Sequence, residues 1–168
     1  MIRRATPEDA AAVGDVFVRA RDRMTYLPRI PDEDRPTLGG WIVERHEVWV
    51  AEEGAIAGFA GVSPGWLDHL YVDPGFQDQG IGSALLTHAK SLQPDGLQLW
   101  VFQKNEGARR FYERYGFRLA ELTEGAGNQE REPDARYEWT PCGAGSSRAC
   151  LPRIARAMTR RWISFVPS

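Results

Sequence analysis

The chain has 168 residues, of which 42% are hydrophobic, 11% aromatic and 26% charged, which is typical of one globular domain rather than of a disordered chain. No run approaches the ~18 apolar residues that a membrane-spanning helix needs, and the N-terminus lacks the apolar segment of a secretory signal. We therefore expect a cytoplasmic protein with no membrane span. The two cysteines, Cys142 and Cys150, have no histidine in their segment, so we expect no metal.

The formal net charge of −2 is unevenly distributed along the chain. Five of the 21 Lys and Arg residues, and none of the 23 Asp and Glu residues, lie after Thr140, so the preceding part carries −7. An acidic body suits a cationic partner such as an amine, although a mildly acidic surface is also common in soluble proteins. It does not suit nucleic acid, and the sequence contains no nucleic-acid recognition motif.

The spacing of apolar residues and the positions of glycine and proline predict a series of strands and helices. The first helix begins at Pro7, after a Thr6 cap, and the prolines that follow it predict a loop before a second short helix. Glu53-Gly54 joins two β-rich runs into an antiparallel hairpin. The predicted strands are 2–4, 47–52, 55–60, 66–72, 97–101, 117–124 and 136–139. The predicted helices are 7–23, one ending near 44, 81–92 and 106–115.

One stretch organises these elements: the strand 66–72, a stop at Asp73-Pro74, a polar glycine-bearing turn, and the helix that begins at Ile81. That helix has its apolar positions at helical spacing, namely Ile81, Ala84, Leu85, His88 and Leu92. A helix N-terminus has unpaired N–H groups and the positive end of the helix dipole, so a bare turn there can hold an anion. The strand–helix–strand order also implies a right-handed crossover and a parallel pair of strands.

The turn reads Gln77-x-x-Gly80-x-Gly82 and follows Leu70-Tyr-Val-Asp-Pro74. Together they resemble the acyl-CoA signature of the GNAT superfamily of N-acetyltransferases. A second block, from Asn105 through Ala108, Phe111-Tyr112-Glu113 and Gly116-Phe117, is similar to a downstream motif of the same family. The resemblance implies an α/β (α+β) fold: a mixed twisted sheet of about six to seven strands with a central parallel pair, flanked by about four helices. Such a domain would span 1–140, followed by a basic extension at 141–168.

The resemblance also implies a site for acetyl-CoA. Backbone groups of Leu70, Tyr71 and Val72 would bind pantetheine, and Asn105 would face the cofactor. The segment that would wrap the pyrophosphate is Gln77, Asp78, Gln79, Gly80, Ile81, Gly82 and Ser83. Tyr112 would act as the general acid, because a phenol is protonated at neutral pH and can donate to a departing thiolate. The alternative interpretations are that strand 66–72 is an ordinary core strand that binds no cofactor, and that Tyr112 is a core aromatic residue without a catalytic role.

The acceptor side is less defined. Tyr26 and Trp41 lie in the region that covers the acceptor in such folds, although both can simply pack on the sheet. The strand position where some relatives have a catalytic glutamate holds Trp100 instead. The remaining candidates for the base are Asp68, His69, Glu44 and His46. A base that works through ordered water, or an acceptor that is already neutral, is equally possible. Tyr26, Trp41, Asp68 and His69 are therefore the predicted substrate-binding residues.

These patterns predict an acetyl-CoA-dependent N-acetyltransferase that acts on a primary amine of a small molecule or a protein, and a homodimer is left open. The alternative is a non-catalytic acyl-CoA-binding module on the same fold. In the extension, Leu151, Ile154, Met158 and Trp162 form a basic amphipathic helix pattern. It could dock on a partner or on an anionic surface, pack on its own domain, or form a weakly ordered extension.

Overall fold

Strands of residues 1–141, the part of the chain that the computed structural model describes, form a single mixed sheet in the order β1-β2-β3-β4-β5-β7-β6. The strands are β1 Ile2–Arg4, β2 Glu47–Glu52, β3 Ile56–Ser63, β4 Trp66–Val72, β5 Leu97–Phe102, β6 Arg118–Thr123 and β7 Asp134–Trp139. The α-helices are α1 Ala10–Arg21, α2 Arg35–Arg45, α3 Ile81–Leu92 and α4 Glu106–Arg114. The 3-10 turns are η1 Pro7–Asp9 and η2 Pro74–Phe76. The predicted mixed sheet with four helices is confirmed.

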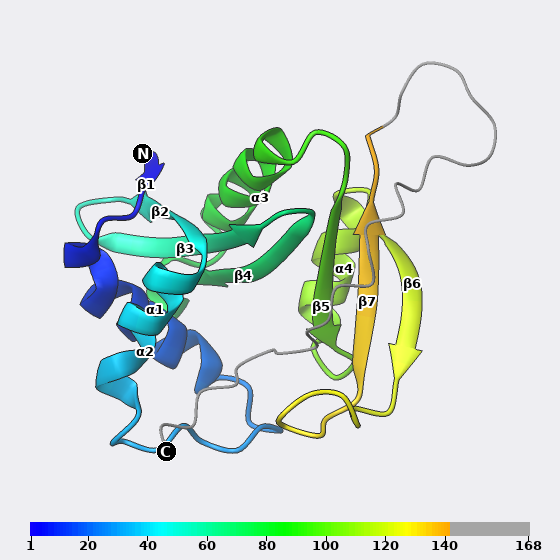
Figure 1. Ribbon diagram of the computed structural model, residues 1–168, viewed down its shortest axis with the longest axis horizontal. Coiled ribbons are helices and arrows are strands. Elements are labelled where there is room, and N and C mark those ends of the chain that lie inside the picture. Colours follow the sequence, from blue (N-terminus) through cyan, green and yellow to red (C-terminus); the bar gives the residue numbers. More distant parts are fainter. Residues whose placement is uncertain (142–168) are drawn as a thin grey trace.

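The helices form a layer on each face of the sheet (Figure 1). Helices α1 and α2 pack on the half that contains β2 and β3, around Val16, Phe17 and Phe59. Helices α3 and α4 pack on the opposite face, around Leu85, Leu86 and other buried side chains. The predicted extension, with its helix pattern, lies outside the described residues except for its first residue, so the division at residue 140 stays a prediction.

Two local details differ from the predictions. The first helix begins with the 3-10 turn η1, so its α-helical part starts at Ala10 rather than Pro7. The buried stripe of α3 consists of Ile81, Leu85, Leu86 and Ala89. Ala84 is exposed, and His88 stacks against Trp49 with ring centroids 4.2 Å apart. The stripe is shifted because α3 presents Leu86 and Ala89, rather than Ala84 and His88, to the core of the sheet.

The parallel pair β4 and β5 separates soon after it starts. Its only register pair is Trp66 opposite Gln98, supported by a hydrogen bond from the Gln98 N–H to the Gly65 carbonyl at 2.9 Å. By contrast, β3 stays paired with β4 as far as Val72. Figure 1 shows β4 and β5 spreading apart toward the C-terminal end of β4. Backbone groups on the β5 side of β4 are therefore freed from the ladder, and a gap opens in the middle of the sheet.

Helix α4 lines this gap with Ala108 and Tyr112, and hydrogen bonds cap it at both ends. The Asn105 side-chain oxygen accepts a hydrogen bond from the Ala108 N–H at 3.1 Å, which caps the N-terminus as predicted. At the other end Gly116 has φ +84°, and the Phe117 N–H bonds back to the Tyr112 carbonyl at 3.1 Å. Capping at both ends sets the rotation of the helix and hence the direction of the Tyr112 side chain.

Candidate active site between the splayed strands

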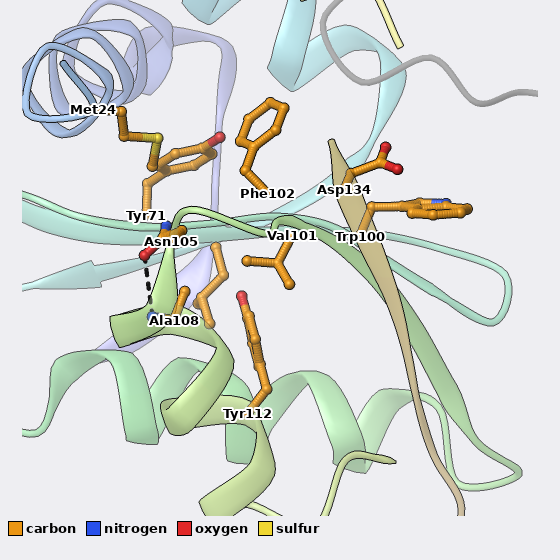
Figure 2. A pocket seen from close by; sticks show the side chains of 10 residues that line it. Met24, Tyr71, Trp100, Val101, Phe102, Asn105, Ala108, Tyr112 and Asp134 are labelled. Carbon is orange, nitrogen blue, oxygen red and sulfur yellow. Dashed lines mark hydrogen bonds between the residues drawn. The ribbon is translucent and has the colours of Figure 1, made fainter. Parts of the chain in front are cut away.

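A half-open pocket of roughly 530 Å³, including the solvent at its mouth, occupies the gap between β4 and β5. The lining side chains come from both strands, from α4 and its N-cap, from the segment that follows α1 and from the start of β7 (Figure 2). They are Met24, Leu70, Tyr71, Trp100, Val101, Phe102, Asn105, Ala108, Tyr112 and Asp134.

Tyr112 rises from α4 with its hydroxyl directed into this pocket (Figure 2). The residue is 8% exposed, and its ring also contacts Phe111 and Phe117 at centroid distances of 5.4 and 5.6 Å. Tyr112 is therefore a core aromatic and a pocket residue at once. Burial raises the pKa of its phenol above the ordinary value, and Tyr71 adds to the shift. The hydroxyl thus stays protonated at neutral pH and remains a hydrogen-bond donor.

The predicted pantetheine-binding residues lie on the two sides of the pocket. Leu70 and Tyr71 line it from β4, and Asn105 lines it from the start of α4. Because the Asn105 oxygen is committed to the helix cap, its NH₂ group is the part that can donate to a ligand. Val72 is not among the lining residues; its carbonyl accepts a hydrogen bond from Gln77 Nε2 at 3.3 Å.

The turn between β4 and α3 is anchored at its first residue. One oxygen of Asp73 accepts a hydrogen bond from the Gly75 N–H at 2.8 Å, and the other pairs with Arg19 of α1 at 2.6 Å. Gln79 Nε2 donates to the Gly75 carbonyl at 3.4 Å, and Asp78 has φ +62°. The turn is thus held to α1 and to itself, and its side chains bend back toward the backbone.

The N-terminus of α3 has the bare backbone that an anion requires. Gly80 has φ +82° and occupies the N-cap, and a Cβ built there would meet nothing within 4 Å. The Ala84 N–H bonds to the Gly80 carbonyl at 3.0 Å, so the N–H groups of 81–83 precede the first helical bond. Ser83 Oγ accepts a hydrogen bond from the Tyr115 hydroxyl at 2.6 Å, and Ile81 is buried in the core. These residues can hold a pyrophosphate at the helix N-terminus.

Of the four predicted substrate-binding residues, Tyr26 lies beside the pocket. Its ring contacts the ring of Phe102, with centroids 6.1 Å apart, and its hydroxyl is buried without a hydrogen-bond partner. Burial raises the pKa of this phenol. Trp41, Asp68 and His69 are not among the lining residues.

Those three residues instead belong to a cluster between α2 and the sheet. His69 is 3% exposed, its ring lies 4.6 Å from that of His46, and burial lowers its pKa from 6.5 to about 3. Trp41 stacks on His46 at 5.8 Å. Asp68 accepts a hydrogen bond from Ser63 at 2.6 Å, and burial raises its pKa. Their predicted role in substrate binding stays a prediction.

Six pocket residues were not among the predicted site residues: Met24, Trp100, Val101, Phe102, Ala108 and Asp134. The Asp134 carboxylate is 6% exposed at the residue level and accepts hydrogen bonds from Asn128 Nδ2 at 2.9 Å and from the Thr123 hydroxyl. Trp100 also lines the pocket, so the β5 position where some relatives have a glutamate carries no carboxylate in this chain. The only sequence signal for Asp134 was the acid-rich segment 124–134, and such a segment is equally typical of a solvent-exposed loop.

Two further features concern residues 1–141 only. In this part of the chain no three His, Cys, Asp or Glu side chains are placed to hold a metal ion together. None of its helices has the length and apolar character needed to cross a bilayer.

Comparison with known proteins gives one family model and several relatives. The model described as "Acetyltransferase (GNAT) domain" matches residues 44–119, which contain the parallel pair, the glycine turn and α4. Peptidyl-lysine N-acetyltransferase YiaC of Escherichia coli is 29% identical over 109 residues, covering 64% of this chain and 69% of YiaC. Peptidyl-lysine N-acetyltransferase YjaB of Escherichia coli is 35% identical over 79 residues, covering 46% of this chain and about half (53%) of YjaB.

Two solved structures share the fold. The solution structure of apo-form YjaB from Escherichia coli superposes with a TM-score of 0.68 at 27% identity, covering 86% of this chain and 98% of YjaB. The structure of yncA from Salmonella typhimurium with its cofactor acetyl-CoA superposes with a TM-score of 0.64, covering 89% of this chain and 98% of that one; at 18% identity this shows the fold alone.

Proposed function

Because the chain belongs to the GNAT superfamily of acetyltransferases, we propose that it moves the acetyl group of acetyl-CoA to a primary amine, and that the amine is a lysine side chain of a protein. The observation that carries this proposal is the pocket between the splayed strands β4 and β5, into which the Tyr112 hydroxyl points (Figure 2). The names of YiaC and YjaB, both peptidyl-lysine N-acetyltransferases, support a protein lysine as the acceptor.

Acetyl-CoA fits the residues present. The N–H groups at the start of α3 would hold the pyrophosphate, since Gly80 leaves the approach to them open. The freed backbone edge of Leu70 and Tyr71 and the Asn105 amide would hold the pantetheine arm along the gap between the strands. Few cationic side chains stand at the turn, so phosphate binding rests on backbone N–H groups. When bound, the thioester supplies an acyl group that is activated toward amines.

Residues of the chain would then act on the acyl carbonyl and on the leaving sulfur. Backbone N–H groups of β4 would polarise the acyl carbonyl, and the apolar lining of Leu70, Val101 and Phe102 would exclude water from it. As the neutral amine forms its bond to the acyl carbon and the carbon–sulfur bond breaks, Tyr112 would donate its O–H proton to the departing sulfur, and the proton lost by the amine nitrogen would return to the Tyr112 oxygen through water. Its burial keeps that proton in place at neutral pH.

Release of free CoA thiol tests this proposal. The full chain is incubated with acetyl-CoA and a peptide that contains one lysine, and thiol release is followed together with the mass of the peptide. We expect thiol release that depends on the peptide and a mass increase of one acetyl group on its lysine. Binding of acetyl-CoA without transfer to any amine in a panel would instead identify a non-catalytic acyl-CoA-binding module.

A further inference from the structure

The loop between β6 and β7 is folded against α1 and brings carboxylates to the side of the pocket. Glu130 Oε1 lies 3.0 Å from Arg21 NH2 of α1, and the two side chains are 4% and 5% exposed. Asn128 fixes the loop internally: its Nδ2 donates to the Glu132 carbonyl at 2.7 Å and to Asp134 Oδ2 at 2.9 Å. The positions of Glu130, Glu132 and Asp134 are therefore set by the fold rather than by solvent.

Lys104 meets this loop from the other side of the gap. Its Nζ lies 2.8 Å from Glu132 Oε1 and 5.9 Å from the centre of the Tyr26 ring. The backbone next to it is pinned, since the Gln103 N–H bonds to the Pro133 carbonyl at 2.9 Å. Lys104 directly precedes Asn105, and the ring of Tyr26 contacts that of Phe102. Asn105 and Phe102 both line the pocket. An ammonium group is thus already held between a carboxylate and an aromatic ring at the edge of the site.

The cluster has unused hydrogen-bonding atoms, and one of its two cations, Lys104, is largely exposed. Its three carboxylates, Glu130, Glu132 and Asp134, face two cations, Arg21 and Lys104; Arg131 of the same loop is exposed. Glu130 Oε2 and the Tyr26 hydroxyl are buried with no hydrogen-bond partner. Buried charges and polar groups without partners are costly, so this arrangement favours a ligand that brings both a positive charge and N–H donors.

We propose that Glu132, Glu130 and Tyr26 form the binding site for the acceptor's ammonium group, and that Lys104 is a resident cation which the acceptor displaces. The inference rests on the proposed function and assigns a substrate class within it: a primary ammonium at the end of a flexible, unbranched stem, as in a lysine side chain. The Lys104 side chain is 59% exposed, so it can leave Glu132 for solvent. The arriving ammonium then takes over its contacts with Glu132 and the Tyr26 ring.

The test uses Nα-acetyl-lysine amide as the cationic acceptor and hydroxylamine as a neutral nucleophile at pH 7.5. Glu132→Gln removes one charge and keeps the shape of the side chain. Glu124→Gln, at an exposed position of the same loop, is the matched control. We expect Glu132→Gln to raise the KM for the lysine derivative about tenfold or more, as for a lost charge-assisted hydrogen bond. The acetyl-CoA affinity and the rate with hydroxylamine should remain within about twofold of the wild type.

Lys104→Met should act in the opposite direction and lower the KM for the lysine derivative, a gain that misfolding cannot imitate. Calorimetric binding of Nα-acetyl-lysine amide provides a readout without turnover. Loss of this binding in Glu132→Gln but not in Glu124→Gln would support the inference even if no acetyl transfer occurred, in which case the proposed function alone would fail. If transfer occurs but the two glutamine variants behave alike, or Lys104→Met raises the KM, the ammonium site is overturned and the proposed function stands.

Discussion

The two sides of the pocket are built in different ways. The cofactor side comes from one continuous stretch, in which β4, the glycine turn and α3 follow one another between Trp66 and Leu92. The proposed acceptor side is assembled from the end of α1, from Lys104 before the Asn105 cap of α4, and from the β6–β7 loop. Its ion pair between Arg21 and Glu130 joins residues 109 positions apart. A contiguous site leaves a motif in the sequence, whereas a site assembled from distant segments leaves only single residues.

The two sides also differ in what their residues must provide. At the cofactor side, φ +82° at Gly80 and the approach of a ligand to bare N–H groups restrict the residue type at fixed spacing. At the acceptor side a carboxylate can come from any element that reaches the same place, so spacing carries no information. We therefore expect substitutions on the two sides to separate cleanly into effects on acetyl-CoA and effects on the amine.

The largest effect should come from Tyr112, where the two sides meet. Tyr112→Phe keeps the ring that packs against Phe111 and Phe117 but removes the donor to the leaving sulfur. We expect kcat to fall about 100-fold, with little change in the KM for acetyl-CoA. Tyr137→Phe is the control, because it removes a buried hydroxyl that bonds to Glu113 outside the pocket. Turnover should be measured from pH 6 to 9, a range around the thiol pKa of ~8.5. If Tyr112→Phe turns over near the wild-type rate across this range, Tyr112 has only a packing role.

A smaller effect, confined to the cofactor side, is expected at Gly82. A Cβ there would lie in ordinary contact with Val72 and Phe111, at 3.6 and 3.7 Å, so the helix can accept a side chain. A valine would nevertheless crowd the N–H groups of 81–83, and we expect acetyl-CoA affinity to fall about tenfold or more. Gly40→Val in α2, where a Cβ would meet nothing within 4 Å, is the matched control. Wild-type affinity in Gly82→Val, measured by calorimetry, would show that the pyrophosphate binds elsewhere.

Acid should weaken the layer of α1 and α2 through His69. Its folded-state pKa of about 3 lies below the ordinary 6.5, so the unfolded chain binds more protons between these values. The stabilising contribution is complete above pH ~6.5 and is lost as the pH falls toward 3, with a slope of up to about 1.4 kcal/mol per pH unit. Urea unfolding should show stability falling more steeply with acid in the wild type than in His69→Phe, by up to this slope. Identical slopes would mean that His69 is not buried in its neutral form.

The smallest effect is expected from removing the extension. The seven described strands, the glycine turn and the described lining residues of the pocket all lie within residues 1–141. A chain that ends at Pro141 should therefore keep cooperative melting and acetyl-CoA affinity within about twofold. Loss of either property would place the extension within the core of the domain.

The sequence predicted the strand and helices of the proposed cofactor side closely because their signals are local. Strand 66–72 has the predicted bounds, since Ser63-Pro64-Gly65 and Asp73-Pro74 mark its ends. Asn105 and Gly116 bound α4 by capping, which requires those residue types. The buried stripe of α3 was shifted in the prediction because alanine and histidine fit an apolar or an exposed position equally well.

The acceptor side could not be predicted in the same way. Lys104, Glu130 and Glu132 are ordinary charged residues of loops and follow no period. Their proximity depends on the β6–β7 pairing and on the ion pair with α1, both of which are tertiary. Asp68 and His69, which adjoin the cofactor motif in sequence, lie instead in the cluster below α2.

The central claim is that the gap between β4 and β5 and the N-terminus of α3 together hold acetyl-CoA. The most direct measurement is the change in backbone amide chemical shifts when acetyl-CoA is added to the ¹⁵N-labelled full chain. We expect the largest changes at the amides of Leu70, Tyr71 and Gly80 to Ser83, with Asn105 among the next affected. Saturable binding that leaves these amides unchanged and shifts another region of the protein would contradict the claim.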